Sequence, residues 1–385
     1  MTYLTARRRT LGLVSSLALF GALAAGAQSQ AAPHPGVSNT LSTTHFWNDL
    51  QLDFLPGNTW ERLRDNLQWQ DRSHDARVQH WIDHYRANPH NVIAIIERAR
   101  PWMAWINEKV EIRGLPGEIA LIPFVESSFD PTARSHRGAA GLWQFMPGTG
   151  DALGLSRRNG YDGRLDVVAS TEAALDYIEL QADQWYEGDL ELSLAAYNAG
   201  AGTVNRARHA ANARGEPTDY WHLQLPNETM HYLPKLNAIA AIVADPDAHG
   251  IDLPDIDDAP AFAKVAVEAP INLGQLATMT GVDRAELSAL NPGLTNGSAN
   301  PATGEVVLVP IEYEEVVLAH LTTPASAYPD TGVEQHVVAR GDSLSSIAAL
   351  HGSSVEEIRR HNGLNGDLIH EGQRLEIPRR SLASR

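Results

Sequence analysis

Apolar residues recur at helical spacing along most of the first 245 residues. A run of them on one helix face predicts a helix, and its members are Ile93, Ile95, Ile96, Ala99 and Met103. The same spacing predicts long helices at residues 170–186, 190–197 and 229–243. Pro116 suits the first turn of a further helix, whereas residues 148–160 have the composition of a loop. No alternating strand pattern precedes residue 260, so this part of the chain is predicted to be mainly α.

The pattern changes after Asp245, because residues 245–260 are rich in Pro and Asp and mark a domain boundary. Beyond it lies an internal repeat with an offset of 71 residues. The repeated positions are Leu273, Leu276, Ala277, Gly281, Glu286, Leu287 and Asn291, which match Leu344, Ile347, Ala348, Gly352, Glu357, Ile358 and Asn362. Each copy ends in a β-rich segment closed by proline, and Ser354 with Glu357 has capping-box spacing. Each copy is therefore predicted to be a small α+β unit of order βααβ.

The N-terminus has the pattern of a secretory signal peptide. Three arginines at 7–9 precede an uncharged, mostly apolar run at 11–27 that ends in small residues, with a predicted cut before Gln28. The run is shorter than the roughly 20 strongly apolar residues of a membrane span, although retention as an uncleaved anchor stays open. The predicted organisation is a signal peptide (1–27), a flexible linker (28–44), a Trp-rich helical region (45–112), a catalytic domain (113–245), a first repeat unit (262–311), a linker (322–333) and a second unit (334–378).

Composition excludes several classes of function. The chain has 30 basic and 47 acidic residues, a net charge of −17, which opposes binding to nucleic acid. It contains no cysteine, which excludes disulfides, thiolate metal sites, a cysteine nucleophile and a lipid-modified cysteine. His80 and His84 have the spacing of a zinc motif, but Trp81 stands where that motif needs glutamate. We therefore expect neither a metal nor a cofactor.

The candidate chemistry begins at Glu126, which follows the apolar run 120–125 and opens the string E-S-S-F-D-P. Partial burial disfavours the charged carboxylate and raises its pKa, as a general acid working near neutral pH requires. The glycine-rich loop 138–148 carries Trp143, Gln144 and Met146. Aromatic faces and amide donors suit a saccharide, and glycine permits close backbone approach to a ligand. Asp130, before a proline, is interpreted as a turn residue.

Two later segments fit the same site. Tyr197 and Asn198 lie at the end of a predicted helix, before glycines. Glu228 and Tyr232 are spaced i and i+4, which predicts that both lie on one helix face. The six tryptophans between residues 47 and 105 are interpreted as core, with a stacking platform for glycan as the alternative.

These strings, E-S-S-F-D-P, G-A-A-G-L-W-Q-F-M-P-G-T, A-Y-N-A-G and E-T-x-x-Y, together resemble the lytic transglycosylases of glycoside hydrolase family 23, of the membrane-bound lytic murein transglycosylase D type. The resemblance covers nearly all of the chain after the signal peptide and implies a lysozyme-like fold. The second repeat unit resembles a LysM peptidoglycan-binding module. The first resembles a degenerate one, because Pro270 and Ile271 stand where Gly341 and Asp342 lie.

The resemblance assigns roles by position. Glu126 would be the single acid and base, oriented by the hydroxyl of Tyr197, with Glu228 a buried structural carboxylate near Tyr232. The groove would be lined by Ser135, Gly141, Gln144, Met146 and Asn198. In the LysM module, glycan would be contacted by Gly341, Asp342, Ser343 and Leu344 and by Asn365, Leu368 and Ile369.

The implied reaction cleaves the β-1,4 bond between N-acetylmuramic acid and N-acetylglucosamine without water and leaves a 1,6-anhydro end. The alternatives are a lysozyme-like hydrolase and an inactive wall-binding scaffold. We expect an exported, periplasmic protein that binds the wall and is not a lipoprotein. Endo or exo cleavage, tolerance of cross-links, protein partners, oligomeric state and sugar binding by the first unit are left open.

Overall fold

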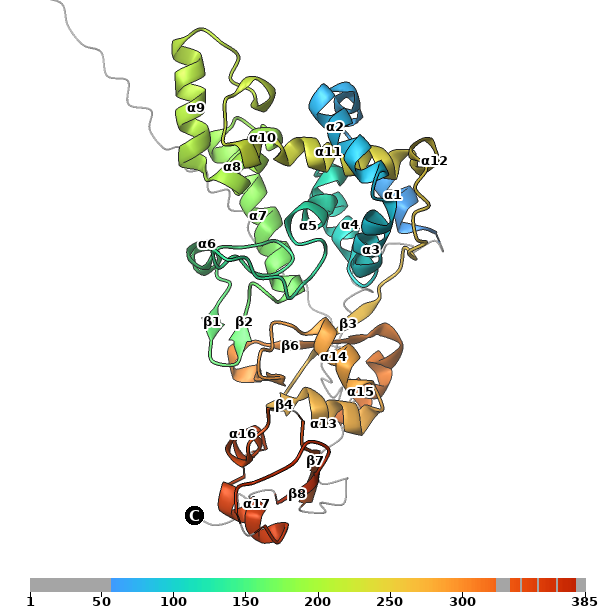
Figure 1. Ribbon diagram of the computed structural model, residues 1–385, viewed down its shortest axis with the longest axis vertical. Helices are drawn as coiled ribbons and strands as arrows, with labels where there is room; N and C mark the ends of the chain where they lie inside the picture. Colours follow the sequence, from blue (N-terminus) through green and yellow to red (C-terminus); the bar gives the residue numbers. More distant parts are fainter. Residues whose placement is uncertain (1–56, 323–332, 340, 352, 365, 379–385) are drawn as a thin grey trace, which may run out of the picture. The chain divides into compact units, whose positions relative to one another are not determined.

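The computed structural model describes residues 57–322 and 333–378, except 340, 352 and 365 (Figure 1). The predicted signal peptide, the linker 28–44 and Trp47 lie outside these residues, as do all but the ends of the linker 322–333. A mostly helical region up to His249 is followed by two small α+β units, which confirms the predicted fold class.

The first helices are short, and the first two begin at side-chain caps. They are α1 (Thr59–Asp65), α2 (Ala76–Arg86), α3 (Pro89–Ala99), α4 (Met103–Ile112) and α5 (Ile122–Glu126). The side chains of Asn58 and Asp75 accept backbone N–H bonds at the starts of α1 and α2. The helix predicted from Ile93 to Met103 is in fact two helices, because Pro101 lacks the N–H that would continue α3. Pro116 caps a 3₁₀ turn (Gly117–Leu121) that leads into α5.

The second half of the helical region contains α6 (Pro147–Ala152), α7 (Val167–Trp185), α8 (Leu190–Ala199), α9 (Ala201–Ala213), α10 (Asn227–Met230), α11 (Tyr232–Ala244) and α12 (Pro246–His249). The prediction of a plain loop at 148–160 was wrong, since it contains α6 and the strand β1 (Arg157–Arg158). That strand pairs with β2 (Tyr161–Asp162). Two-residue strands are too short to show alternation. The helix predicted at 229–243 is broken at His231, which caps both α10 and α11.

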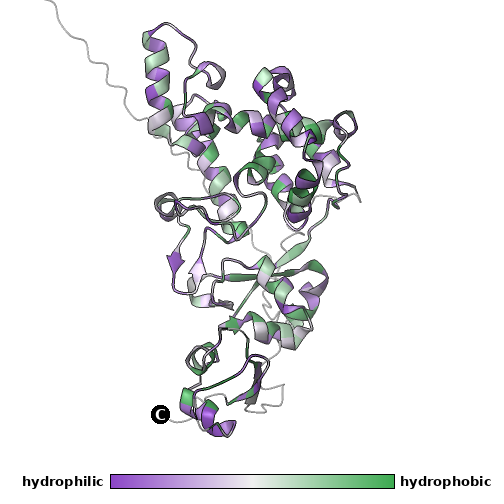
Figure 2. Cartoon of the chain, viewed as in Figure 1, coloured by the Kyte–Doolittle hydropathy of each residue, from purple (hydrophilic) through white to green (hydrophobic). Residues whose placement is uncertain are grey.

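The core of the helical region is built around α11, which is buried along almost its whole length. Trp60, Trp102 and Trp105 are at most 2% exposed and belong to this core, as the sequence indicated, whereas Trp69 and Trp81 are partly exposed. In contrast, α9 buries only Val204 and Ala211, and hydrophilic and hydrophobic colours alternate along it in Figure 2. No described helix is long and apolar enough to cross a membrane.

Each C-terminal unit has the predicted order of strand, two helices and strand. In the first, β3 (Phe262–Ala266) pairs with β6 (Val306–Pro310) around α13 (Leu273–Thr280) and α14 (Arg284–Leu290). A short pair, β4 (Ile271–Asn272) with β5 (Ser298–Ala299), and a terminal helix, α15 (Glu314–Thr322), are added to it. In the second, β7 (Val333–Val337) pairs with β8 (Arg374–Pro378) around α16 (Leu344–Leu350) and α17 (Val355–His361). The predicted capping box at Ser354 and Glu357 is present.

The repeated asparagine makes equivalent hydrogen bonds in the two units. Asn291 donates to the carbonyl of Leu308 and accepts its N–H, at 2.7 and 2.8 Å. Asn362 makes the same pair of bonds with Glu376, at 2.5 and 2.7 Å. Each asparagine therefore ties the end of the second helix to the closing strand, which explains its place in the repeat.

Candidate active site

Glu126 is the last residue of α5, at the end of a buried apolar segment. Ile122, Pro123 and Phe124 before it are buried, and Glu126 itself is partly exposed. Burial raises the pKa of Glu126 to about 7, with a smaller upward contribution from Glu228. A hydrogen bond from Tyr232 and the charge of Lys235 act in the opposite direction. The carboxyl therefore exchanges its proton near neutral pH, as acid–base catalysis requires.

The phenol that contacts Glu126 is Tyr232. Its hydroxyl donates to Oε1 of Glu126 at 2.6 Å. The hydroxyl of Tyr197 instead donates to the backbone carbonyl of Trp143 at 2.7 Å. The expectation that Tyr197 orients Glu126 is therefore corrected, because the end of α8 points that hydroxyl at the neighbouring loop. Tyr197 lies close enough for Glu126 to raise its pKa, after burial as the larger cause.

The expectation that Glu228 is buried is also wrong. Glu228 is exposed and lies in the four-residue helix α10, whereas Tyr232 begins α11. The break at His231 separates the i and i+4 positions that a single helix would have placed on one face. Glu228 acts on Glu126 as a nearby negative charge.

The loop 138–148 is held by a buried arginine. The guanidinium of Arg164 donates to the carbonyls of Gly138 and Phe145, at 2.7 and 3.1 Å, and forms an ion pair with Asp162 at 2.8 Å. Gly141 has φ +82°, and a Cβ there would lie 1.8 Å from the carbonyl oxygen of Arg164. The close approach predicted for this glycine is therefore to the chain itself.

Trp143 is not the aromatic face that the sequence indicated. It is completely buried, and its Nε1 donates to Oγ1 of Thr171 at 2.8 Å. Gln144 has φ +48° and donates to the carbonyls of Ala133 and Gly141. The apolar side chain that this loop exposes is Met146, at 43%. The side chains of this loop that can face a ligand are therefore the thioether of Met146 and the amide of Gln144.

Two other predicted groove residues take part in local bonds. Oγ of Ser135 accepts the N–H of Ala139 at 2.9 Å and closes the turn before Gly141, while the residue stays exposed. Oδ1 of Asn198 accepts the hydroxyl of Thr229 at 2.7 Å, which joins the end of α8 to α10. Asn198 is half-buried, so its remaining amide atoms can face a ligand.

Sequence reasoning missed Lys235. It lies one turn after Tyr232 on α11, and its charge lowers the pKa of Glu126. Its Nζ also lies 4.7 Å from the ring centroid of Trp81, a cation–π contact between α11 and α2. The i, i+3 spacing from Tyr232 was the signal that could have found it.

Asp130, the nearest other carboxyl in the sequence, is engaged in a turn. Its Oδ1 accepts the N–H and the hydroxyl of Thr132, at 2.8 and 2.7 Å. This geometry agrees with its interpretation as a turn residue.

The C-terminal unit contains the loops expected to contact glycan. Ser343 forms a capping box with Ser346, and Leu344 is buried in the core of the unit. Asp342 accepts the N–H of Ala339 at 2.8 Å, which holds the first loop, where Gly341 has φ +95°. In the second loop Leu368 is 77% exposed. Asn365 lies outside the described residues.

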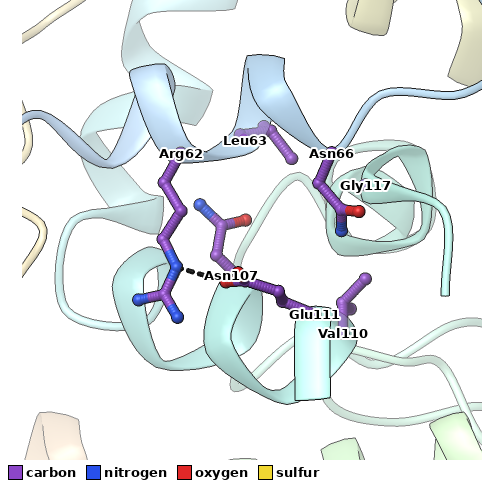
Figure 3. A pocket seen from close by; sticks show the side chains of 7 residues that line it. All are labelled: Arg62, Leu63, Asn66, Asn107, Val110, Glu111 and Gly117. Carbon is purple, nitrogen blue, oxygen red and sulfur yellow. Dashed lines mark hydrogen bonds and ion pairs between the residues drawn. The ribbon is translucent and has the colours of Figure 1, made fainter. Parts of the chain in front are cut away.

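A small hollow between α1 and α4 is separate from these residues (Figure 3). Its lining consists of Arg62, Leu63, Asn66, Asn107, Val110, Glu111 and Gly117. Arg62 and Glu111 close it with an ion pair of 2.5 Å. This arrangement is a packing defect bridged by a surface ion pair, and no candidate site residue reaches it.

Comparison with known proteins gives three domain matches. The profile of the transglycosylase SLT domain matches residues 103–219, and that of the LysM domain matches residues 336–378. Residues 261–325 match the profile described as the LysM-like domain of lytic transglycosylase MltD. The first repeat unit is thus recognised separately from the second.

Whole proteins similar to this chain were also found. The membrane-bound lytic murein transglycosylase D of Escherichia coli (strain K12) is 34% identical over 97% of this chain and 85% of its own length. A putative tributyltin chloride resistance protein of Alteromonas sp. (strain M-1) is 33% identical over 46% of this chain and 83% of its own length. The membrane-bound lytic murein transglycosylase F of Pseudomonas syringae pv. syringae (strain B728a) is 32% identical over 27% of this chain and 20% of its own length.

Proposed function

This chain belongs to the membrane-bound lytic murein transglycosylase D family and is a peptidoglycan lytic transglycosylase, and we propose that Glu126 is its single catalytic acid and base. The observation that carries the proposal is a partly buried carboxyl with a pKa of about 7 that accepts a 2.6 Å hydrogen bond from Tyr232. A group with this pKa is protonated often enough to act as an acid and ionised often enough to act as a base.

The proposed reaction needs no second enzyme carboxylate. Retaining and inverting glycosidases use two carboxyl groups, about 5–5.5 or 6.5–9.5 Å apart, whereas Asp130 is held in a turn and Glu228 is exposed. Glu126 gives its proton to the glycosidic oxygen as the bond to C1 breaks. The 2-acetamido group of the substrate stabilises the positive charge at C1.

The same carboxylate completes the reaction. It takes the proton of the 6-hydroxyl of N-acetylmuramic acid as that oxygen bonds to C1, which gives a 1,6-anhydro sugar and consumes no water. Tyr232 donates to the carboxylate while it is ionised. Ser135, Gln144, Met146 and Asn198 are proposed to line the groove, since their loops carry the exposed polar and apolar groups described above.

Residues 334–378 are proposed to bind the glycan strand through the loop around Asp342 and the loop that exposes Leu368. Such a tether raises the local concentration of the enzyme on an insoluble polymer. We further propose export by the segment 1–27 and retention in the periplasm on the wall, with the domain boundaries given above. Fractionation of cells that express the full chain tests the location, and recovery in the cytoplasm would contradict it.

The test of function uses the purified chain from residue 28 on isolated sacculi. We expect Glu126→Gln to abolish release of soluble fragments while the variant still sediments with sacculi. Asp130→Asn is the matched control, because asparagine can accept the same turn hydrogen bonds, and it should retain activity. Wild-type activity in Glu126→Gln would refute the role of Glu126.

A further inference from the structure

The two repeat units differ in the surroundings of one equivalent loop. After Asn291 in the first unit, residues 294–299 begin and end with side chains packed in that unit's core. After Asn362 in the second unit, residues 364–369 likewise begin and end with side chains, Leu364 and Ile369, that pack against that unit's core. The two loops are therefore equivalent, and the second is the one that exposes Leu368 and is proposed above to contact glycan.

In the first unit this loop is contacted by the β1–β2 hairpin of the catalytic domain, while Thr295 and Asn296 stay partly open to solvent. The N–H of Asp162 donates to the carbonyl of Gly293, at the start of the loop, at 2.9 Å. At the tip of the hairpin, the α-carbon of Gly160 lies so close to Asn296 that an added Cβ would be 2.4 Å from the asparagine's Nδ2. Gly293 is also packed against Asp166, with 3.0 Å from an added Cβ to the Cβ of Asp166.

The hairpin is also anchored by side chains on either side of this contact. Arg158 forms an ion pair with Glu305, whose side chain is only 5% exposed. Tyr161 packs against the hydrophobic core of the first unit, and its hydroxyl donates to Asp166 at 2.9 Å. An ion pair with one buried partner is costly to break, because the remaining charge is left without compensation.

A second contact joins the same two parts of the chain elsewhere. The completely buried ring of Phe262, the first residue of β3, lies 5.5 Å from the ring of Trp102 and 5.9 Å from that of Trp105. The first unit is therefore held against the helical domain at two separate places, the β1–β2 hairpin and Phe262. Two contacts fix its orientation, whereas a single contact would let it rotate.

The hairpin leads directly to the loop of the active site. Asp162 forms the ion pair with Arg164, and Arg164 donates to the carbonyls of Gly138 and Phe145 on either side of Gln144. Contacts thus run without interruption from the first unit through the hairpin to the loop that carries Gln144.

We propose that the first repeat unit is a positioning module for the catalytic loop and not a second glycan binder. The enzyme's own β1–β2 hairpin contacts this unit at Gly293 and Asn296 and would obstruct a glycan strand there, and Arg158 and Glu305 act as positioning residues through Asp162 and Arg164. The proposal goes beyond the proposed function and relies on it only for the activity readout.

A disulfide tests the contact directly, because the chain has no cysteine of its own. The double variant Gly160→Cys/Asn296→Cys of the chain from residue 28 should cross-link on oxidation and keep both sacculus binding and turnover within about twofold of the reduced form. The pair Gly160→Cys/Glu286→Cys is the control and should stay reduced, since Asn296 and not Glu286 lies against Gly160. Failure of the first pair to cross-link, or loss of sacculus binding once it is cross-linked, would overturn the proposal.

Arg158→Ala tests the positioning role. We expect kcat on soluble glycan strands to fall roughly tenfold, with sacculus binding unchanged, because the altered loop carries Gln144 and Met146 whereas the LysM module is untouched. The cysteine cross-link should restore kcat in this variant under conditions in which circular dichroism shows both the reduced and the cross-linked forms to be fully folded, because a disulfide would otherwise also rescue a loss of folding. Arg157→Ala is the matched control on the same strand, because Arg157 pairs with Asp151 at the surface. Unchanged kcat in Arg158→Ala, or no rescue by the cross-link, would contradict the role.

These outcomes are separable from those of the proposed function. If the wild-type chain releases no anhydro product, the proposed function fails. The cross-link and sacculus-binding results still decide whether the β1–β2 hairpin contacts the loop 294–299.

Discussion

The hydroxyl of Tyr232 donates a hydrogen bond of 2.6 Å to Oε1 of Glu126, whereas the hydroxyl of Tyr197 donates to the backbone carbonyl of Trp143. Burial raises the pKa of both phenols, so both remain donors at neutral pH. The bond from Tyr232 favours the ionised carboxylate and opposes the effect of burial on the pKa of Glu126. It therefore helps to set the pH at which Glu126 loses its proton.

Tyr232→Phe should move the pH dependence of activity. Without the hydrogen bond the pKa of Glu126 rises above about 7, and the decline of kcat/KM at alkaline pH should shift upward by about one pH unit. Tyr197→Phe is the matched control. It should leave this decline in place and lower the free energy of unfolding by about 1 kcal/mol. A shift caused by Tyr197→Phe and not by Tyr232→Phe would reverse the assignment of the two phenols.

Glu126→Gln should stabilise the fold at alkaline pH. The pKa of Glu126 is about 7 in the folded chain and near the ordinary 4.5 when unfolded. Between these values the folded state binds more protons, so wild-type stability falls as pH rises. Urea unfolding should show the variant about 1–2 kcal/mol more stable at pH 8 and equal to wild type below pH about 4. Equal stability of the two proteins at both pH values would mean that the pKa of this carboxyl is not raised.

The sequence predicted the burial before Glu126 better than it predicted the contacts of the candidate site residues. Glu126 could be recognised because an apolar run precedes it, and burial follows from that run. The spacing of Glu228 and Tyr232 suggested one helix, but His231 ends one helix and begins the next, a tertiary outcome that side-chain periodicity does not encode. The direction of the Tyr197 hydroxyl likewise depends on where a distant loop folds.

The glycines in the loop 138–148 also show that local sequence does not determine tertiary contacts. Gly141 and Gly148 look alike in the sequence, yet Gly141 has φ +82° and lies against the carbonyl of Arg164, while nothing lies within 4 Å of the position of a Cβ at Gly148. The difference arises from residues more than a dozen positions away. In the same way Trp143, which resembled a sugar platform, is a buried anchor for α7 through Thr171.

Gly141→Ala should destabilise the catalytic domain strongly. The new methyl would overlap the Arg164 carbonyl in a backbone conformation that alanine rarely adopts, at a cost of about 2–4 kcal/mol. Gly148→Ala, in the first turn of α6, should cost nothing or stabilise slightly. Thermal unfolding of both variants measures this difference, and equal melting temperatures would show that Gly141 is not packed as described.

Leu368→Ser should weaken wall binding without unfolding the second unit. The side chain is 77% exposed and contributes little to the unit's core, but its burial against a sugar ring would be lost, which should weaken sacculus binding by about tenfold. Met279→Ser, at another exposed apolar side chain on the first unit, is the control and should bind as wild type. Unaltered sedimentation of Leu368→Ser with sacculi would remove this loop from the proposed glycan contact.

In the proposed reaction one carboxyl, Glu126, cleaves the glycan while the substrate's own hydroxyl replaces water. Mass spectrometry of the fragments that the chain from residue 28 releases from sacculi is the decisive measurement. We expect fragments about 18 Da lighter than hydrolytic products, which is the mass of the water not consumed, and none from Glu126→Gln. Fragments with hydrated reducing ends would contradict it and would make the protein a hydrolase on the same fold.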